Sequence, residues 1–246
     1  MKKIALFSIL LLVPVFLNGC AKTPVGGPTL PATNRLTVNM TLQQAISPTF
    51  FYNFAFDDDG DAGDGPAAVI GTTTLANGVV GGSFSVLVQC RGNNFLVFRR
   101  RDLGNGQETL ERASNAFVVN PVASGNTITF TLDLDATIDN AATPPTAADR
   151  LFAAGVTQLD VNFVTTSEVI RDPNNLLLKP FDALGEVPRA PNLYETFNIS
   201  TTRTFRNVDT VREPSNDADP GNTNISAQQL ASLDITDFTI DVRRSN

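Results

Sequence analysis

Residues 127–135, which read TITFTLDLD, decide the fold class of this 246-residue chain. Apolar side chains at positions 128, 130, 132 and 134 alternate with threonine or aspartate at every other position. Successive side chains of a strand point to opposite faces, so this period of two predicts a strand with one face buried and the other in water. The stretch is too polar on alternate positions for a buried helix.

The same period recurs along most of the chain, with turn-forming residues between the repeats. The rows that show it are Leu36–Leu42, Phe50–Phe56, Phe84–Cys90, Leu159–Phe163 and Leu193–Ile199. Arg91–Asn94 separates one row from the apolar stretch that follows and is typical of a hairpin turn. Near the end of the chain the apolar positions change phase between Ile235 and Phe238, which predicts a β-bulge or corner near Thr236–Asp237.

Two short segments carry helix signals. Pro145–Asp149 begins like a capped helix, with Asp149 placed to reach back to the first turn and Gly155 to end it, and Ser226–Ser232 has room for one or two turns. Eight to eleven strands around these helices predict an all-β fold. We expect an antiparallel β-sandwich, immunoglobulin-like or jelly-roll-like, with a β-barrel as the second choice.

The first residues of the chain predict that the protein is exported. Lys2 and Lys3 precede the apolar run Ile4–Phe16, and small residues follow. This order is the pattern of a secretory signal peptide, and the run is too short for a membrane-spanning helix.

The end of that segment, Leu17-Asn18-Gly19-Cys20, resembles the lipobox of bacterial lipoproteins. The resemblance implies cleavage by signal peptidase II before Cys20 and acyl chains on that cysteine, which anchor a protein stably to a membrane. Ala21 at the next position implies sorting to the outer membrane, with the domain on its periplasmic or surface face. The alternative is an ordinary signal peptide that ends near a cysteine.

These features divide the chain into three parts. Residues 1–19 are the expected signal peptide. Residues 20–34 carry the lipidated cysteine and a tether with three prolines and two glycines. Residues 35–246 form the expected single β-sandwich domain, which is long enough to bury one core.

Composition excludes several classes of function. The net charge of −7 becomes −9 once Lys2 and Lys3 leave with the signal peptide, which argues against a nucleic-acid partner. The chain has no histidine, so it has no histidine triad and no histidine metal ligand. Cys90, without a partner once Cys20 is acylated, is expected to be a small buried residue. Arg99–Arg101 is either a patch for anions or charge that protects a sheet edge.

One dense acidic cluster stands out, Asp57–Asp64, with five carboxylates in eight residues. Calcium prefers six to eight oxygen ligands on a sharply turning chain, so this spacing makes Asp57, Asp59, Asp61 and Asp64 candidate calcium ligands.

The loop resembles the acidic loops of EF-hand and thrombospondin-type calcium repeats. It departs from the EF-hand at its sixth position, Ala62, and at its twelfth, Ala68. The alternative is a solvated turn between strands. A second polar loop, Asp217–Asn222 with Glu213 nearby, either adds oxygen ligands or is a surface connection.

The sequence therefore predicts a lipid-anchored bacterial envelope lipoprotein that binds, adheres or scaffolds and is not an enzyme. Its expected partners are the membrane, through Cys20, and a glycan or an envelope protein. One alternative is a polysaccharide hydrolase that uses a pair of carboxylates among Asp133, Asp135, Asp160 and Glu168. Another is an accessory subunit of an envelope complex.

Overall fold

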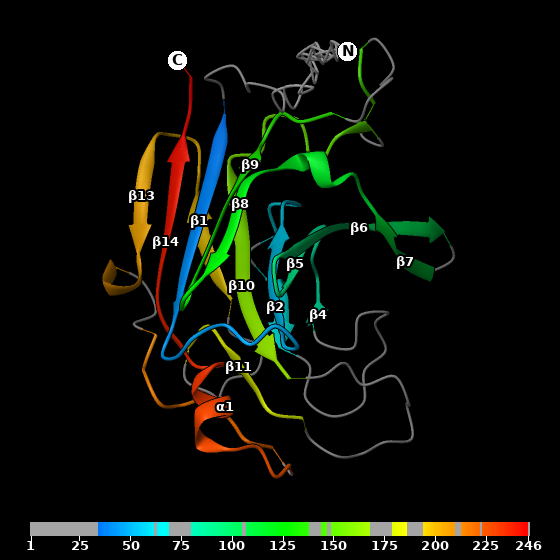
Figure 1. Cartoon of the computed structure of the whole chain (residues 1–246). Coiled ribbons are helices and arrows are strands. Elements are labelled where there is room, and N and C mark those ends of the chain that lie inside the picture. The colour runs from blue at the N-terminus through cyan, green and yellow to red at the C-terminus, as the bar shows by residue number, and fades with distance from the viewer. Residues whose placement is uncertain are drawn as a thin grey trace, which may run out of the picture.

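The computed structural model describes residues 34–61, 63–68, 80–104, 107–137, 144–146, 149–167, 179–185, 194–209, 213–221 and 223–245. Within these residues the chain forms two large antiparallel β-sheets that pack face to face (Figure 1). Neither sheet closes on itself, so the all-β sandwich expected from the alternating rows is confirmed.

The first sheet, called sheet A, has the strand order β13-β14-β1-β9-β8. Its strands are β1 (Arg35–Leu42), β8 (Val118–Ser124), β9 (Thr127–Asp133), β13 (Arg203–Arg206) and β14 (Ile235–Arg243). Strand β1 lies between β14 and β9, so the first and last strands of the described chain are neighbours. The 127–135 stretch thus supplies an interior strand of this sheet.

The second sheet, called sheet B, has the order β11-β10-β2-β5-β6-β7, and β12 pairs with the beginning of β10. Its strands are β2 (Phe51–Asp57), β5 (Val86–Arg91), β6 (Asn94–Gly104), β7 (Gln107–Arg112), β10 (Gln158–Thr166), β11 (Phe181–Ala183) and β12 (Glu195–Asn198). Strands β6 and β7 form a hairpin that extends away from the sandwich in Figure 1.

The remaining elements are short. A two-stranded ribbon joins β3 (Pro66–Ala68) to β4 (Val80–Gly82). Two 3-10 turns, η1 (Asn115–Phe117) and η3 (Asn207–Asp209), and one helix, α1 (Ala227–Ala231), complete the described elements. Among the described residues, no helix is long and apolar enough to cross a membrane.

The core lies between the sheets and is built from the predicted alternating rows. Phenylalanine rings join the two layers edge to face. The ring centroids of Phe54 in sheet B and Phe130 in sheet A are 4.8 Å apart, and those of Phe163 and Phe238 are 5.6 Å apart. Such pairs stabilise beyond their buried area.

The outer face of sheet B is also buried, in part by the β3–β4 ribbon. A second apolar cluster forms there around Ala55, Leu87 and Val164. Polar side chains between them are buried and bonded, as when the Asn53 amide donates to the Val164 carbonyl oxygen at 3.1 Å. Strands β2 and β10 are therefore buried on both faces, which the alternating sequence pattern did not predict.

Two local predictions are confirmed. The pairing of β14 with β1 shifts register so that Thr41 faces Asp237 and Leu42 faces Ile235, which leaves Thr236 as the extra residue of a bulge. Helix α1 begins after Ser226, which forms a capping box with Gln229.

The other expected helix is not among the described elements, since residues 147 and 148 lie outside the described ranges. Asp149 does reach back to the Thr146 backbone N–H at 2.8 Å, as expected.

Candidate metal centre

Two carboxylates face each other at one end of sheet B. Strand β2 ends at Asp57, and its direct partner on β10 is Asp160. Both lie on the outer face, opposite to the core residues Phe56 and Val161, and both are buried, with 3 % and 1 % of their surface exposed. Like charges directly opposite each other destabilise a sheet, so this pair needs protons or a cation.

Asp57 has a buried carboxylate that its hydrogen bonds do not fully satisfy. Its Oδ2 atom is buried and has no hydrogen-bond partner among the described residues. Burial raises the pKa of this carboxyl, and the negative charges of Asp59 and Asp58 raise it further, whereas a hydrogen bond from Ser83 lowers it. A buried acceptor without a donor is costly, and a cation removes that cost.

The loop after β2 brings two more carboxylates to the same place. Oxygen atoms of Asp57, Asp59 and Asp64 lie within 4.8 Å of one another. Calcium binds oxygen at about 2.3–2.6 Å, so ligands on opposite sides of the ion are about 4.6–5.2 Å apart. The three carboxylates are therefore close enough together to bind one such ion.

Asp61, the fourth predicted ligand, is used differently. Its Oδ1 accepts a hydrogen bond from the Gly63 backbone N–H at 2.8 Å, and its own N–H donates to Asp59 Oδ1 at 2.8 Å. These bonds are turns of the Asx type, which shape the loop that carries Asp59 and Asp64. The carboxylate of Asp61 lies outside the group of three but near enough to raise the pKa of Asp160.

Asp160 is a residue that sequence reasoning did not assign to this site. Its Oδ1 accepts a hydrogen bond from the Thr196 hydroxyl on β12. Burial raises the pKa of Asp160, and Asp59, Asp64 and Asp61 raise it further. The only sequence signal was its position, out of phase with Leu159 and Val161, and that signal also fits a solvated residue.

The ring of Tyr194 covers the loop beside the carboxylates. A Cβ atom on Gly65 would lie 2.7 Å from this ring, so only glycine permits the approach. The pKa of the Tyr194 phenol is raised, by burial first and then by the charges of Asp160 and Asp64. One of the two tyrosines of the chain therefore stands next to the acidic cluster.

The donor set decides which metals fit. All the grouped atoms are carboxylate oxygens, and hard cations such as calcium or magnesium prefer oxygen ligands. The loop ligands are exposed while Asp57 is buried, so one side of the group is fixed by the sheet and the other can adapt. Calcium tolerates such irregular coordination, whereas magnesium demands a near-octahedral one.

The other residues considered for catalysis are spread over the fold. Asp133 and Asp135 lie on or just after β9 in sheet A, where Asp133 Oδ1 accepts a hydrogen bond from the Asp135 N–H at 2.9 Å. Asp160 lies on sheet B beside Asp57. Glu168 lies outside the described residues, as does Cys20 with the predicted signal peptide and nearly all of the tether.

The arginines 99–101 do not form one patch. Arg100 donates to the Gly82 carbonyl oxygen at 2.8 Å, and Arg101 pairs with Glu111 across the β6–β7 hairpin at 3.1 Å. Strand β6 lies between β5 and β7, so these arginines do not protect an edge strand, and Arg100 and Arg101 instead contact β4 and β7. Cys90 is buried, and burial raises the pKa of its thiol to about 12, as a core role requires.

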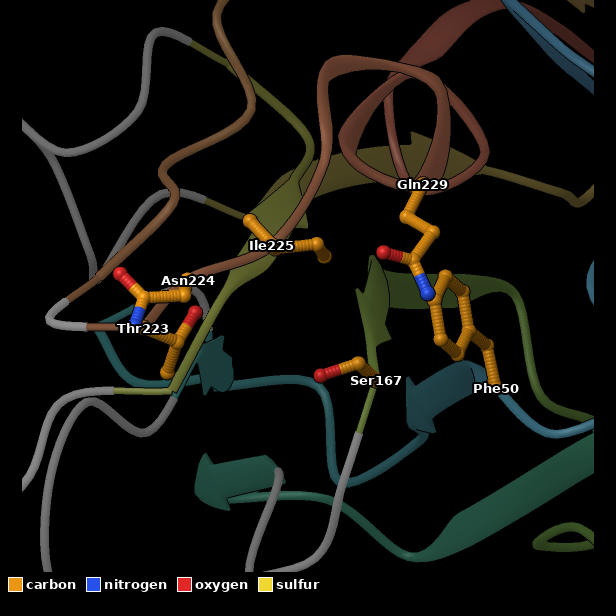
Figure 2. A pocket seen from close by; sticks show the side chains of 6 residues that line it. All are labelled: Phe50, Ser167, Thr223, Asn224, Ile225 and Gln229. Carbon is orange, nitrogen blue, oxygen red and sulfur yellow. The ribbon is translucent and has the colours of Figure 1, made fainter.

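A shallow cavity of about 350 Å³ lies beside α1 (Figure 2). Figure 2 shows Phe50 and Gln229 on one side of it, Thr223 and Asn224 on the other, and Ser167 between them. Its polar groups serve the fold, since Gln229 completes the α1 capping box and the Thr223 hydroxyl donates to the Pro220 carbonyl oxygen at 2.8 Å. Two of the four polar side chains that line the cavity are therefore already bonded.

Comparison with protein-family models, curated proteins and solved structures finds no match to this chain.

Proposed function

We propose that this chain is a lipid-anchored bacterial envelope lipoprotein whose β-sandwich binds calcium through Asp57, Asp59 and Asp64, with Asp160 as a further ligand. Its role is binding, adhesion or scaffolding, and not catalysis. The observation that carries the proposal is the buried Asp57 Oδ2 atom, which has no hydrogen-bond partner among the described residues, together with the group of three carboxylates to which Asp57 belongs.

The calcium part follows from charge and position. Asp57 and Asp160 come from neighbouring strands, and Asp59 and Asp64 come from the loop between β2 and β3. A cation among them joins that loop to the sheet and removes the repulsion between the paired aspartates. Extracellular calcium modules bind with dissociation constants of about 10⁻⁴–10⁻³ M, a range suited to a protein outside the cytoplasm.

The anchor part rests on the start of the chain. We infer a lipid anchor from the resemblance of Leu17–Cys20 to a lipobox, and a spacer from the proline-rich residues 21–34. Such a domain meets partners near the membrane, and the glycan and envelope-protein classes stay the expected ones. The acidic charge of the chain argues against nucleic acid as a partner.

Thermal unfolding with calcium and with chelator tests the site. Calcium at one hundred times its dissociation constant adds about 2.7 kcal/mol, which raises the midpoint by roughly 5–10 °C for a domain of this size. The double variant Asp59→Asn with Asp64→Asn should lose most of that shift. Asp209→Asn, an exposed aspartate on η3, is the matched control and should keep it. An undiminished shift in the double variant rejects the loop as the site.

Metabolic labelling with palmitate tests the anchor. The full chain should take up the label, the Cys20→Ser variant should not, and Cys90→Ser should behave like the unmodified chain. Label in the Cys20→Ser protein would show that the lipobox interpretation is wrong.

A further inference from the structure

A second group of carboxylates lies at the opposite end of β10, on the inner face of sheet B. Asp182 on β11 is the direct partner of Thr165, and Thr165 is the direct partner of Tyr52 on β2. Residues directly opposite each other share a face of the sheet, so Asp182 points the same way as the core residue Tyr52. Asp160 and Thr165 are five residues apart on one strand, which separates the two groups by about 17 Å.

Three chain segments meet at this second group. Oxygen atoms of Asp182, Asp217 and Asp234 lie within 4.8 Å of one another, and Asp182 and Asp234 are buried. Backbone N–H groups hold two of the carboxylates in place. Ile235 donates to Asp182 Oδ2 at 2.6 Å, and Asn216 donates to both oxygens of Asp234 at 2.9 Å.

Glu213 is a further buried carboxylate, and one of its oxygens has no hydrogen-bond partner in the described part of the chain. It is only 6 % exposed, and its Oε2 accepts a hydrogen bond from the Gly185 N–H at 2.7 Å. Its Oε1 atom is buried and has no hydrogen-bond partner in the described part of the chain. Burial raises the pKa of Glu213 to about 10, and the charges of Asp182, Asp217 and Asp234 contribute, although Glu213 is not one of the three residues whose oxygens lie within 4.8 Å of one another.

We propose that Glu213, Asp182, Asp217 and Asp234 form a second, buried site for a hard divalent cation of the calcium class. The donors are oxygens alone, which selects against soft and borderline metals. A carboxylate oxygen that accepts one N–H bond keeps a second lone pair for a metal. The backbone donors thus act as the outer shell that orients the ligands.

The competing solution is a proton shared among the buried carboxylates. Lys179, which is also buried and makes an interaction of its own, lies three residues before Asp182 and adds positive charge to this segment.

One residue of the group borders a cavity. This cavity of about 180 Å³ lies between α1 and the loop that Asp234 holds, and Gln43, Asn216, Leu230 and Asp234 are among the residues that line it. Figure 1 shows α1 at the end of the sandwich where β14 begins. The bound ion would join β11, the 213–221 loop and the start of β14.

The two tyrosines of the chain make the two sites separately observable. The chain has no tryptophan. Tyr194 lies beside the first group. Tyr52 lies on β2 and Asp182 on β11, with Thr165 of β10 between them. The Tyr52 hydroxyl donates to the Ser232 carbonyl oxygen at 3.1 Å. Terbium, which replaces calcium at oxygen sites, emits when a nearby excited tyrosine transfers its energy to it.

The experiment therefore measures tyrosine-sensitised terbium emission and the calcium content of the purified chain. We expect two ions per chain. The Tyr52→Phe variant should lose the emission from the buried site while keeping both ions. Glu213→Gln should keep the fold by circular dichroism and bind the second ion more than about tenfold more weakly.

A background that lacks the first site separates this proposal from the previous one. In the Asp59→Asn, Asp64→Asn chain we expect one ion and emission that depends on Tyr52. That result supports the buried site even if the loop binds nothing. No ion in this background, or an ion whose affinity is unchanged by Glu213→Gln, overturns the proposal and assigns the cluster to proton sharing or to another role.

Discussion

Without calcium, raising the pH from 5.5 to 8 should destabilise the domain, and Glu213 should be the main cause. Its pKa rises from the ordinary 4.5 to about 10 in the folded state, so the folded chain holds a proton that the unfolded chain releases. A raised pKa stabilises fully below the unfolded value, and this stabilisation is lost as the pH rises through the folded value. Asp182, whose pKa burial also raises, acts in the same direction.

The size of the effect follows from the shift. One pH unit between the two pKa values changes the free energy of unfolding by about 1.4 kcal/mol for each such group. Glu213 alone therefore removes about 3 kcal/mol between pH 5.5 and 8, or on the order of 10 °C in the unfolding midpoint. Few other groups interfere, since the chain has no histidine and the pKa of the buried Cys90 thiol lies well above this window.

Urea denaturation followed by circular dichroism, at several pH values in chelator, measures this slope. Glu213→Gln should flatten it, because the amide does not titrate. Glu111→Gln, an exposed residue on β7, is the control and should leave the slope unchanged. Calcium should also reduce the slope if it binds the carboxylates in their ionised form. A stability that rises over this range, or a fall that is just as steep in the Glu213→Gln protein, would refute the reasoning.

Three further perturbations test the fold around the sites. Phe130→Ala removes a ring that packs on Phe54 at 4.8 Å and should destabilise the domain by about 3–5 kcal/mol in urea denaturation. Gly82→Ala should lower the midpoint of thermal unfolding by several degrees, because Gly82 has φ +68° and a Cβ there would lie 2.2 Å from the Gly65 carbonyl oxygen. Cys90 should resist iodoacetamide at pH 8 in the native state and react once urea unfolds the chain; rapid labelling of the native protein would contradict its burial.

The core face of each strand was predictable because it depends only on the period of two. The bulge at Thr236 was predictable for the same reason. The apolar positions change phase between Ile235 and Phe238, and the pairing of β14 with β1 shifts register at this point. The capped turn at Ser226 was predictable for a similar reason, because a helix start depends on residues three apart.

The outer face of sheet B was not predictable in this way. Alternating polar residues such as Asn53 and Asn162 indicate a solvated face, yet the β3–β4 ribbon covers them and the Asn162 amide donates to the Pro66 carbonyl oxygen at 3.1 Å. What covers a face is set by tertiary contacts, and the alternation does not report it. Asp160 was therefore not assigned to the calcium group, whereas Asp57, Asp59 and Asp64 were grouped because they are close in the sequence.

The buried carboxylate group on the inner face could not be predicted from local sequence patterns. Its members span residues 182–234, and the sequence showed only Glu213 and Asp217 as part of a polar loop. Their meeting depends on β11 pairing with β10 while β14 begins beside it, and neither contact leaves a local pattern.

Both acidic groups lie at ends of β10, on opposite faces, and this placement suggests why a sandwich of this composition keeps them. If Cys20 is acylated, Cys90 has no partner, so the described domain has no disulfide to close its long connections. Carboxylates link these segments instead. Asp234 accepts hydrogen bonds from the backbone at 216–218, Glu213 accepts one from Gly185, and Asp57 at the start of the acidic loop faces Asp160 on β10. A buried acceptor that organises backbone donors is stable only when its own charge is balanced. On this reasoning the cations complete links that the carboxylates already make, and removing them should loosen the ends of the sandwich before its phenylalanine core.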